Sequence, residues 1–588
     1  MAPKEPVVSA TSDSSSPAAS VIDDGSLKFV YEQGGNNALP SYQEATGAPV
    51  ETRSPLGYKV RWVSATMLNI GMMIGTGVFS TPSTILSDTG SVGLSLIFWT
   101  IGFVVAAANL AVYLELTSYF PSRSGSEVVY LEQAYPRPKY LLPTTFAVQA
   151  VILSFSSGNA IEYLFQVADY SPTNWQLKGV AIAGYTVAVL LLSFHTRFSL
   201  YLVNVVTIVK LVTLIFISIL GLVVLGGHTR VPDPTANFRN AFEGTTNSGY
   251  GITNALVKVM FAYNGYQNAM NVVNEVKNPV KTLKKSASLG LITVAVLYVL
   301  CNIAYFAAVP KAELVKSKQI AATLLFSAVF GSRGATRGLS FLIALSAFGN
   351  LIAVLIGQSR MIRECARQGV IPFPKFWVNT RPFGTPLGPY FIKWFVTIIM
   401  ILAPPAGDAF NFIVDLQSYP AAVFSALLAV GIFLIRRQRK KIGKTETEFR
   451  AWNIAAIFTV LVNIYLLAMP WYPPAGEQTA ETSVSGTQHT ALLDWESNDN
   501  ELQLIFFSVS ASLAICGIYY VVWIYLLPKW YNYQIRQEVL VLEDGSNTHR
   551  LVKVPNEEVA AWDEEHDVEG NLRRRTSGGD GGDSKEDA

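Results

Sequence analysis

The chain has 588 residues, of which 50% are hydrophobic and only 15% are charged, and its formal net charge at pH 7 is +2. This composition differs strongly from that of a soluble globular domain, and so small a net charge gives no reason to expect nucleic-acid binding. It indicates a polytopic, all-α membrane protein in a lipid bilayer.

The chain divides into three parts by composition. Residues 1–58 are rich in Ser, Ala, Pro, Gly and acidic residues, have no apolar periodicity and contain no signal-peptide core, which predicts a disordered tail. Residues 59–527 are strongly apolar and predict the membrane domain. Residues 528–588 are charged and polar and predict a second tail, in which charge runs are most simply a solvated surface.

Twelve apolar stretches in the membrane domain are long enough to cross a bilayer, which takes about 20 residues each. Their approximate limits are 60–86, 91–119, 142–168, 178–195, 199–226, 249–273, 286–309, 338–360, 388–404, 409–435, 451–470 and 503–527. An even number of spans places both termini on one side of the membrane.

Lys and Arg in the short loops predict which side that is. Basic residues gather in 123–139, 277–285, 360–381 and 436–441, which the twelve spans place on one side, whereas the loop 472–500 on the other side is acidic and polar. Cytoplasmic loops carry an excess of Lys and Arg. Both termini are therefore predicted to be cytosolic.

The first span is interrupted by glycine within residues 69–82. Gly75 and Gly77 lack a Cβ, so the backbone there is free to unwind and a ligand can approach it closely. An unwound helix at membrane depth persists only where protein or a cavity covers it. The half-helix after the break offers free amides to an anion, and the half-helix before it offers carbonyls to an ammonium group. Gly71 and Gly75 also form a small-xxx-small pattern, for which close helix packing is an equally good explanation.

The sixth span has a matching interruption within residues 261–268. Phe261, Ala262, Asn264 and Gly265 lie in a stretch with unusually many polar groups for mid-membrane depth, which a lipid-facing helix tolerates poorly. Two interrupted helices at corresponding positions of two five-helix repeats point to a transporter site at the repeat interface.

Two ionisable residues inside predicted spans are candidates for ion coupling. Lys210 lies well within the fifth span, where a lysine is costly unless it is paired or faces a cavity; the simpler alternative is a lysine that extends to the membrane surface. Glu162, beside Asn159 in the third span, is a second candidate for a proton-carrying group. Glu127 and Glu132, before the third span, are expected to pair with basic residues at the cytosolic side, with Arg360 as the candidate partner.

No enzyme motif competes with this interpretation. The chain has neither a Gly-x-Ser-x-Gly elbow nor a Walker loop, and its five histidines are scattered without metal-ligand spacing, so we expect no enzyme activity, metal site or cofactor. The three cysteines lie in or beside apolar segments and are expected to be reduced.

Five motifs in register resemble the L-type amino acid transporters of the amino acid-polyamine-organocation superfamily, over essentially all twelve spans. They are residues 74–79 (IGTGVF), 125–132 (GSEVVYLE), 261–266 (FAYNGY), 275–279 (EVKNP) and 359–360 with 367–372 (SR and RQGVIP). The resemblance implies two inverted five-helix repeats with broken helices 1 and 6, followed by two extra helices, and transport by alternating access.

The same resemblance assigns roles to individual residues. Gly75, Thr76 and Gly77 would hold the substrate carboxylate. Carbonyls near Met73, Ile74, Phe261 and Ala262 would receive its ammonium group, with Asn264 beside them. Phe261 matches the aromatic that covers the substrate on its outer side, although an ordinary core aromatic is the plain alternative. Lys210 matches a lysine that replaces a sodium ion in sodium-independent carriers, and would link the first broken helix to a proton cycle.

A further group of segments resembles fungal methionine-transporting members of this family: residues 237–245, 302–311, 401–409 and 519–523. This implies a plasma-membrane permease that imports a neutral L-amino acid with protons as the coupling ion. Methionine is the expected substrate, with leucine and other neutral amino acids left open, because one methylene is worth only about 1–3 kcal/mol in an apolar pocket. A sensor that binds an amino acid without transporting it is the alternative from another class.

Two expectations about partners follow. Mammalian L-type relatives bond a heavy chain through a cysteine between spans three and four, but residues 168–177 contain no cysteine, so no disulfide-linked heavy chain is expected. The tails, with Lys4, Lys28 and Lys59, are candidate sites for ubiquitin ligase adaptors.

Overall fold

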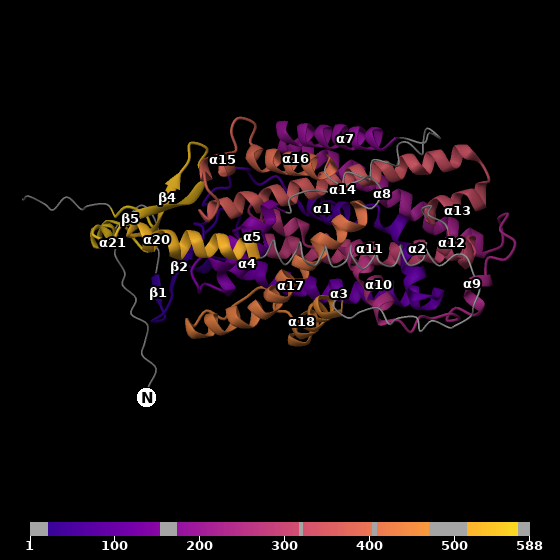
Figure 1. The fold of residues 1–588 in the computed structure, drawn as a ribbon, viewed down its shortest axis with the longest axis horizontal. Helices are drawn as coiled ribbons and strands as arrows, with labels where there is room; N and C mark the ends of the chain where they lie inside the picture. Colours follow the sequence, from indigo (N-terminus) through magenta and orange to yellow (C-terminus); the bar gives the residue numbers. More distant parts are fainter. Residues whose placement is uncertain (1–20, 153–172, 317–320, 403–408, 470–513, 574–588) are drawn as a thin grey trace, which may run out of the picture.

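The computed structural model describes residues 21–152, 173–316, 321–402, 409–469 and 514–573. This part of the chain is mostly helical (Figure 1). The α-helices are α1 (Trp62–Met73), α2 (Gly77–Thr89), α3 (Val92–Tyr119), α4 (Glu127–Ala134), α5 (Leu141–Ile152), α7 (Asn174–Phe194), α8 (Thr196–Leu225), α9 (Ala236–Arg239), α10 (Gly249–Tyr263), α11 (Pro279–Ala308), α12 (Lys311–Lys316), α13 (Ala321–Phe330), α14 (Arg333–Arg367), α15 (Pro374–Val378), α16 (Leu387–Leu402), α17 (Ala409–Lys441), α18 (Asn453–Ala468), α20 (Leu527–Tyr531) and α21 (Val559–Glu565). A 3₁₀ helix, η2 (Asn268–Glu275), a π-helix, η4 (Val522–Leu526), and the helical residues 514–521 directly before η4 are also described.

Within the described residues, six helices are long and apolar enough to cross a membrane, namely α3, α7, α8, α11, α14 and α17. The pair α1 and α2 makes a seventh span if it is counted as one helix with a 41° bend. Each of the other predicted spans coincides at least in part with a described helical segment. The protein is thus a multi-pass helical membrane protein, and the total of twelve spans stays a prediction.

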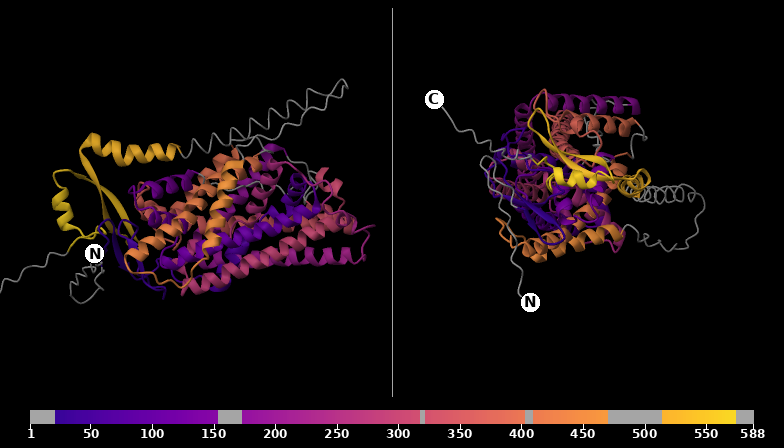
Figure 2. Two further views of the ribbon diagram at one scale, coloured as in Figure 1. Left: turned by 90° about the horizontal axis from the view of Figure 1, so that it is seen from below. Right: turned by 90° about the vertical axis from the view of Figure 1, so that its left-hand side faces the viewer.

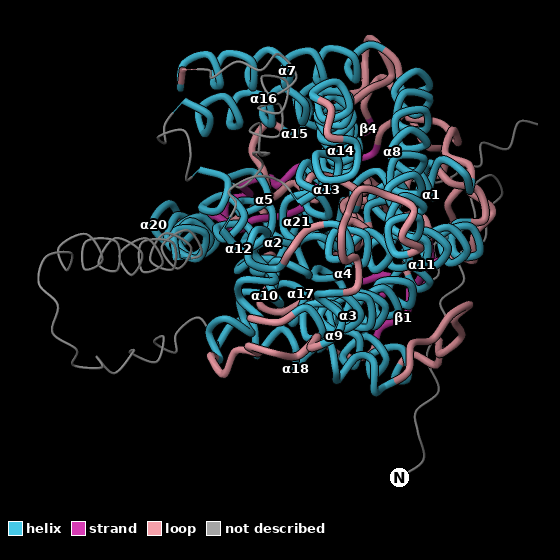
Figure 3. The backbone as a smooth tube through the Cα atoms, turned by 90° about the vertical axis from the view of Figure 1, so that its right-hand side faces the viewer, coloured by secondary structure: helices cyan, strands magenta, loops and turns pink. Residues whose placement is uncertain are grey.

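The bundle is built around α1 and α11. The helix α1 packs against α11, α8, α14 and η2, and α11 also packs against α3 and α8. The pair α7 and α16 lies along one side of the bundle and α18 on the opposite side (Figures 1 and 3). The helices that carry the two sequence breaks are therefore interior.

The outer face of α8 shows what surrounds the bundle. Large apolar side chains on this face are about half exposed along the helix, among them Val205, Ile208, Val212, Ile219 and Leu222. A continuous apolar stripe of this length is unfavourable in water and suits the hydrocarbon core of a bilayer. Lys210, by contrast, is turned to the interior and is only 2% exposed.

Both ends of the described chain fold onto the same end of the bundle, which we call the capped end (Figure 1). Strands β1 (Val21–Asp23), β2 (Lys28–Glu32) and β3 (Ser41–Glu44) form an antiparallel sheet with β2 in the middle. Strands β4 (Tyr533–Val541) and β5 (Asn547–Pro555) form a hairpin, which lies across this end in the right-hand view of Figure 2. We call residues 21–58 together with 532–573 the terminal cap.

The terminal cap corrects the predicted tails. The prediction of a disordered tail is wrong for residues 21–58, where Phe29, Val30 and Glu51 are buried, and the C-terminal segment forms a hairpin in place of a charged tail. The two segments contact each other directly, since the Gln537 side-chain amide donates to the carbonyl of Ala45 at 2.9 Å. The polar and charged composition of these segments predicted disorder because the partners that neutralise their charges lie far away in the sequence.

Candidate functional site

The first break separates α1 from α2 as the glycines predict. Ile74 leaves the helix with φ −79° and ψ 93°, and α2 begins at Gly77 without a side-chain cap. The amides of Thr76, Gly77 and Val78 donate to no acceptor within the described part of the chain. Such amides, at the positive end of a helix dipole, are suited to bind an anion.

The second break follows the last turn of α10. Asn264 is extended, Gly265 has φ +127°, and the chain resumes as the 3₁₀ helix η2. A Cβ on Gly265 would lie 2.8 Å from the backbone nitrogen of Met73, so both the backbone angle and the close approach of the first break require glycine here. The predicted sixth span is thus two short segments joined at a tight turn.

The two breaks lie against each other. A Cβ on Gly77 would lie 3.3 Å from the Cβ of Ala262. The hydroxyl of Tyr298, on α11, lies 2.7 Å from the carbonyl oxygen of Met73 and 3.1 Å from that of Ala262. One side chain therefore reaches the carbonyl-bearing ends of both interrupted helices.

Other interior side chains satisfy the remaining carbonyls of the first break. The Lys210 ammonium donates to Gly71 O at 2.9 Å and to Ile74 O at 2.6 Å. From α14, the Ser346 hydroxyl donates to Gly75 O at 3.0 Å, and the side-chain amide of Asn350 donates to Met72 O. The break is therefore an organised structure, stabilised by donors from α8 and α14.

Lys210 does not extend toward the membrane surface. Its ammonium is held among backbone carbonyls, and Gly349 provides the room for it, because a Cβ there would lie 2.8 Å from the Lys210 Cε. A cation at this position stabilises the negative end of the α1 dipole. The position of Lys210 thus ties α8 to the first break.

The predicted substrate residues are largely brought together. Met73, Ile74, Gly75, Gly77 and Ala262 are buried around the breaks. The remaining two members of the breaks, Thr76 and Phe261, are partly exposed. Asn264 is exposed, and its side-chain oxygen accepts a hydrogen bond from the Gln267 amide at 3.1 Å. Glu162 lies outside the described residues.

Three residues at the breaks escaped the sequence analysis: Tyr298, Ser346 and Asn350. Each is a polar residue within an apolar span, and Ser346 and Asn350 are four residues apart, so they share one face of α14. This spacing could have indicated that the face was turned to polar groups. Tyr298 carried no comparable signal, because a tyrosine is common in a buried helix.

The halves of the broken helices on the side of the capped end are linked. The Ala269 amide donates to the Asn69 side chain at 2.7 Å, and the Asn268 side chain donates to Leu68 O at 3.2 Å. Ahead of α1, Val60 forms a parallel β-bridge with Val276. The helix α1 and η2 therefore form one linked unit.

The capped end holds a buried cluster of ion pairs, the arginine cluster. Arg123 contacts Glu132 and Glu364, both at 3.0 Å. Arg363 contacts Glu51 of the terminal cap at 2.7 Å. The remaining pairs are Arg367 with Glu364 at 2.7 Å, Arg367 with Glu51 at 3.5 Å and Arg360 with Glu275 at 3.0 Å.

The cluster confirms part of the predicted pairing and corrects part of it. Glu132 does pair with a basic residue, but that residue is Arg123, and Arg360 pairs with Glu275 instead. Glu127 accepts a hydrogen bond from the Tyr113 hydroxyl at 2.8 Å. Ion pairs this deeply buried hold their elements in place because removal of one partner leaves an uncompensated charge.

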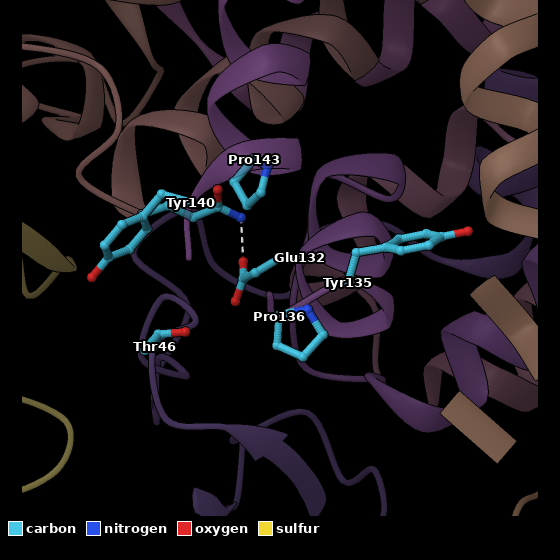
Figure 4. A pocket seen from close by; sticks show the side chains of 7 residues that line it. Thr46, Glu132, Tyr135, Pro136, Tyr140 and Pro143 are labelled. Carbon is cyan, nitrogen blue, oxygen red and sulfur yellow. Dashed lines mark hydrogen bonds between the residues drawn. The ribbon is translucent and has the colours of Figure 1, made fainter. Parts of the chain in front are cut away.

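A small hollow lies beside this cluster, between the terminal cap and the start of α5. Figure 4 shows the side chains of its lining. Among them, the side-chain amide of Gln368 donates a hydrogen bond to Glu132. The lining residues are Thr46, Glu132, Tyr135, Pro136, Tyr140, Pro143 and Gln368. This hollow belongs to the capped end and is separate from the two breaks.

An interior site built from two interrupted membrane helices defines a class of protein, the transporters with discontinuous helices. The family model described as amino acid permease matches residues 60–486, and the chain belongs to this family. It is 36% identical over 508 residues to the high-affinity methionine permease of Saccharomyces cerevisiae, with 85% of each chain covered.

Two further relatives place the chain among amino acid transporters. The low-affinity methionine permease of Saccharomyces cerevisiae is 27% identical, with 91% of this chain and 95% of that protein covered. The human b(0,+)-type amino acid transporter 1 is 29% identical, with 69% and 81% covered. The relatives are permeases and transporters rather than enzymes.

Proposed function

We propose that this protein imports a neutral L-amino acid, methionine first of all, across the plasma membrane. The observation that carries the proposal is the contact between the two breaks, where free amides at the start of α2 face the carbonyl ends of α1 and α10. The similarity to two methionine permeases favours methionine as the side chain. Leucine or another neutral amino acid is the nearest alternative, because an apolar pocket discriminates weakly between them.

The two charged groups of the substrate would bind at opposite sides of the first break. The amides of Thr76, Gly77 and Val78 would bind the carboxylate, as helix N-termini bind anions. Carbonyls of Met73, Ile74, Phe261 and Ala262 would accept from the ammonium group. Ile74 O, which accepts from Lys210, and Phe261 O, which accepts from the Asn264 amide, each keep a second lone pair. Phe261, partly exposed, would cover the bound substrate.

Alternating access would follow from the way the half-helices are linked. The unit formed by α1 and η2 would move as one body away from α2 and α10, in a fold of twelve spans with two inverted repeats. The arginine cluster and the terminal cap close the capped end, which we assign to the cytosol because it contains the basic loops and both ends of the described chain. The structure then corresponds to a state closed toward the cytosol.

Lys210 would couple transport to protons. It bonds directly to Ile74 O, so a change in its charge would alter the carbonyls that bind the substrate. Glu162 is the second candidate for carrying the proton. A single charge moving with the substrate would add roughly 2.3 kcal/mol per 100 mV of membrane potential to accumulation.

The test is uptake of labelled methionine by yeast that lacks its own amino acid permeases and expresses this chain. Uptake is measured at acidic and neutral pH, with and without a protonophore, and with unlabelled neutral amino acids as competitors. We expect accumulation that collapses with the protonophore and a competitor series led by methionine. Surface expression without uptake of any neutral amino acid would contradict the proposal.

The role of Lys210 is tested with Lys210→Met and a matched control, Lys178→Met. Lys178 also donates to a carbonyl, that of Leu402 at 2.9 Å, but from the edge of α7. We expect Lys210→Met to abolish protonophore-sensitive accumulation, while Lys178→Met transports as the wild type does. Proton-driven uptake by Lys210→Met would refute the coupling role.

A non-transporting sensor is the second candidate, and the terminal cap favours it. Glu51 and Ser546 both form hydrogen bonds with Arg363 of α14, so a movement of α14 would displace both terminal segments. The exposed Lys28 on β2 would offer an acceptor to ubiquitin ligase adaptors. A sensor would bind methionine without accumulating it, and no disulfide-linked heavy chain would be needed for either activity.

A further inference from the structure

The first turns of α11 carry basic side chains that no carboxylate in the described part of the chain neutralises. Lys281, Lys284 and Lys285 are exposed there, and none of them forms an ion pair with a described residue. The same is true of Arg61, which is exposed at the N-cap of α1. Because α1 and α11 pack against each other, the positive charges at their starts are close to one another.

An aromatic residue joins the two helix starts. The Lys285 ammonium lies 4.8 Å from the centre of the Trp62 ring, and Trp62, the first residue of α1, is 46% exposed. The amide of Asn278, just before α11, donates to the Asn36 carbonyl of the terminal cap at 2.9 Å, so this surface belongs to the capped end. An exposed tryptophan at the end of a membrane helix is typical of the headgroup level of a bilayer. We define the basic face as Arg61, Trp62, Lys281, Lys284 and Lys285.

The basic face continues along α11 as an apolar stripe. Beyond Lys281 and Lys285, the residues Leu289, Ile292 and Val296 follow at steps of three or four positions, so they share one face of the helix. These three side chains are 45%, 53% and 54% exposed, and such a stripe on a membrane helix faces lipid acyl chains. The lysines therefore lie where the hydrocarbon layer ends and the phosphate groups of the leaflet begin.

We propose that the basic face and the apolar stripe together bind an anionic phospholipid from the leaflet at the capped end. The lysines and Arg61 bind the phosphate and the acidic group of the headgroup, and the guanidinium suits two phosphate oxygens at once. The acyl chains lie along the apolar stripe. Since Arg61 begins α1 and the lysines begin α11, one headgroup bridges the two helices.

A membrane lipid fits this surface better than a soluble anion does. Exposed lysines bind a free anion weakly, because water hydrates both partners. A lipid is already concentrated in the leaflet and adds contact with the apolar stripe. The orientation proposed above makes this the cytosolic leaflet, which carries the anionic lipids that attract basic segments beside membrane helices.

The experiment measures lipid binding to the purified full-length protein in detergent by native mass spectrometry. The probes are phosphatidylserine and phosphatidylcholine with the same acyl chains. Each lysine near the headgroup is expected to contribute about fivefold to the affinity for an anionic lipid. We therefore expect the double variant Lys281→Gln with Lys285→Gln to bind phosphatidylserine about thirtyfold more weakly than wild type, with phosphatidylcholine binding within about twofold.

The matched control is the double variant Lys440→Gln with Lys441→Gln. It removes the same charge from exposed positions at the end of α17, and we expect phosphatidylserine binding within about twofold of wild type. If the first double variant is not recovered in folded form, Lys281→Gln alone is expected to weaken binding about fivefold; unchanged binding in that variant overturns the proposal.

Three further results would overturn the proposal. Equal affinity of wild type for the two lipids would show that the headgroup charge is not recognised. Equal weakening in the two double variants would show a general attraction without a site. Displacement of the lipid by soluble glycerophosphoserine at the same concentration would show a site for a free anion. The measurement does not involve transport, so its result is independent of the proposed function.

Discussion

Glu51 offers the sharpest test of how the terminal cap is attached. Its carboxylate lies 2.7 Å from the Arg363 guanidinium and 3.5 Å from that of Arg367. It also accepts from the Asn274 side chain at 3.1 Å. The two arginine side chains and the carboxylate are each at most 2% exposed. Glu51→Gln keeps the shape of the side chain and removes the charge.

The expected loss of docking free energy is near the lower end of the range for a buried ion pair. Removal of one partner from such a pair costs about 3–5 kcal/mol. Arg363 keeps two other acceptors, Ser546 Oγ at 2.9 Å and Val378 O at 3.1 Å, which limits the loss to about 3 kcal/mol. This corresponds to roughly a hundredfold more frequent opening of the cap.

The assay is amide hydrogen exchange of the purified full-length protein in lipid nanodiscs, followed over residues 21–58. Local opening accelerates exchange in proportion to its equilibrium constant. The control is Glu543→Gln, since Glu543 makes the same kind of contact with Arg381 at 2.7 Å but is 86% exposed. We expect exchange about a hundredfold faster in Glu51→Gln and within about fivefold of wild type in the control, because exposed pairs contribute at most about 1 kcal/mol. Equal exchange in the two variants would refute the view that the buried ion pair holds the cap.

Two further outcomes are expected. Gly77→Val should reduce methionine uptake at least about tenfold at normal surface abundance, because the added methyl groups would clash with α10 where the breaks meet. The control is Gly179→Val, which adds the same groups at a position where a Cβ would meet nothing within 4 Å. Wild-type uptake by Gly77→Val would show that Gly77 is not part of the substrate site. The terminal cap should loosen as the pH rises from 6.5 to 8. Burial, and after it the charge of Glu569, raises the pKa of Glu32 to about 8, and burial raises the pKa of Glu569 to about 7. The ordinary pKa of both carboxyls is 4.5, so the folded cap holds more protons than the unfolded one, and its stability falls as the pH rises toward 8. Burial lowers the pKa of His549 from 6.5 to about 3, so its contribution to the stability of the cap is lost mainly below pH 6.5 and opposes the fall in this interval only slightly. Exchange of the cap that is equal at pH 6.5 and pH 8, or that slows at pH 8, would contradict the assignment.

Much of the membrane domain could be predicted from the sequence alone. Apolar segments of span length follow from the requirement that a bilayer be matched by apolar side chains. The two breaks follow from glycine and polar residues at depths where a regular lipid-facing helix would not carry them. Lys210 stood out for the same reason, because a buried lysine in an apolar helix needs a partner.

The partners themselves were decided by the tertiary structure. Arg360 could be recognised as a residue that needs a carboxylate, but only the packing of η2 against α14 selects Glu275. Glu51 and Arg363 are 312 residues apart, and no local pattern specifies a contact over such a distance. This is why residues 21–58 were predicted to be disordered. Their short strands have too few apolar residues to form a core of their own, and they become ordered by contact with the arginine cluster.

Tyr298 shows the same limit at the site. Periodicity reports that a residue is buried, and burial of a tyrosine in a helix is ordinary. That its hydroxyl reaches two carbonyls depends on the crossing of three helices. The sequence by itself determined where the helices are interrupted, because that is a local property of glycine and polar residues in an apolar span. The tertiary structure alone decided which side chains serve those interruptions, because a hydrogen bond depends on positions that helix packing brings together.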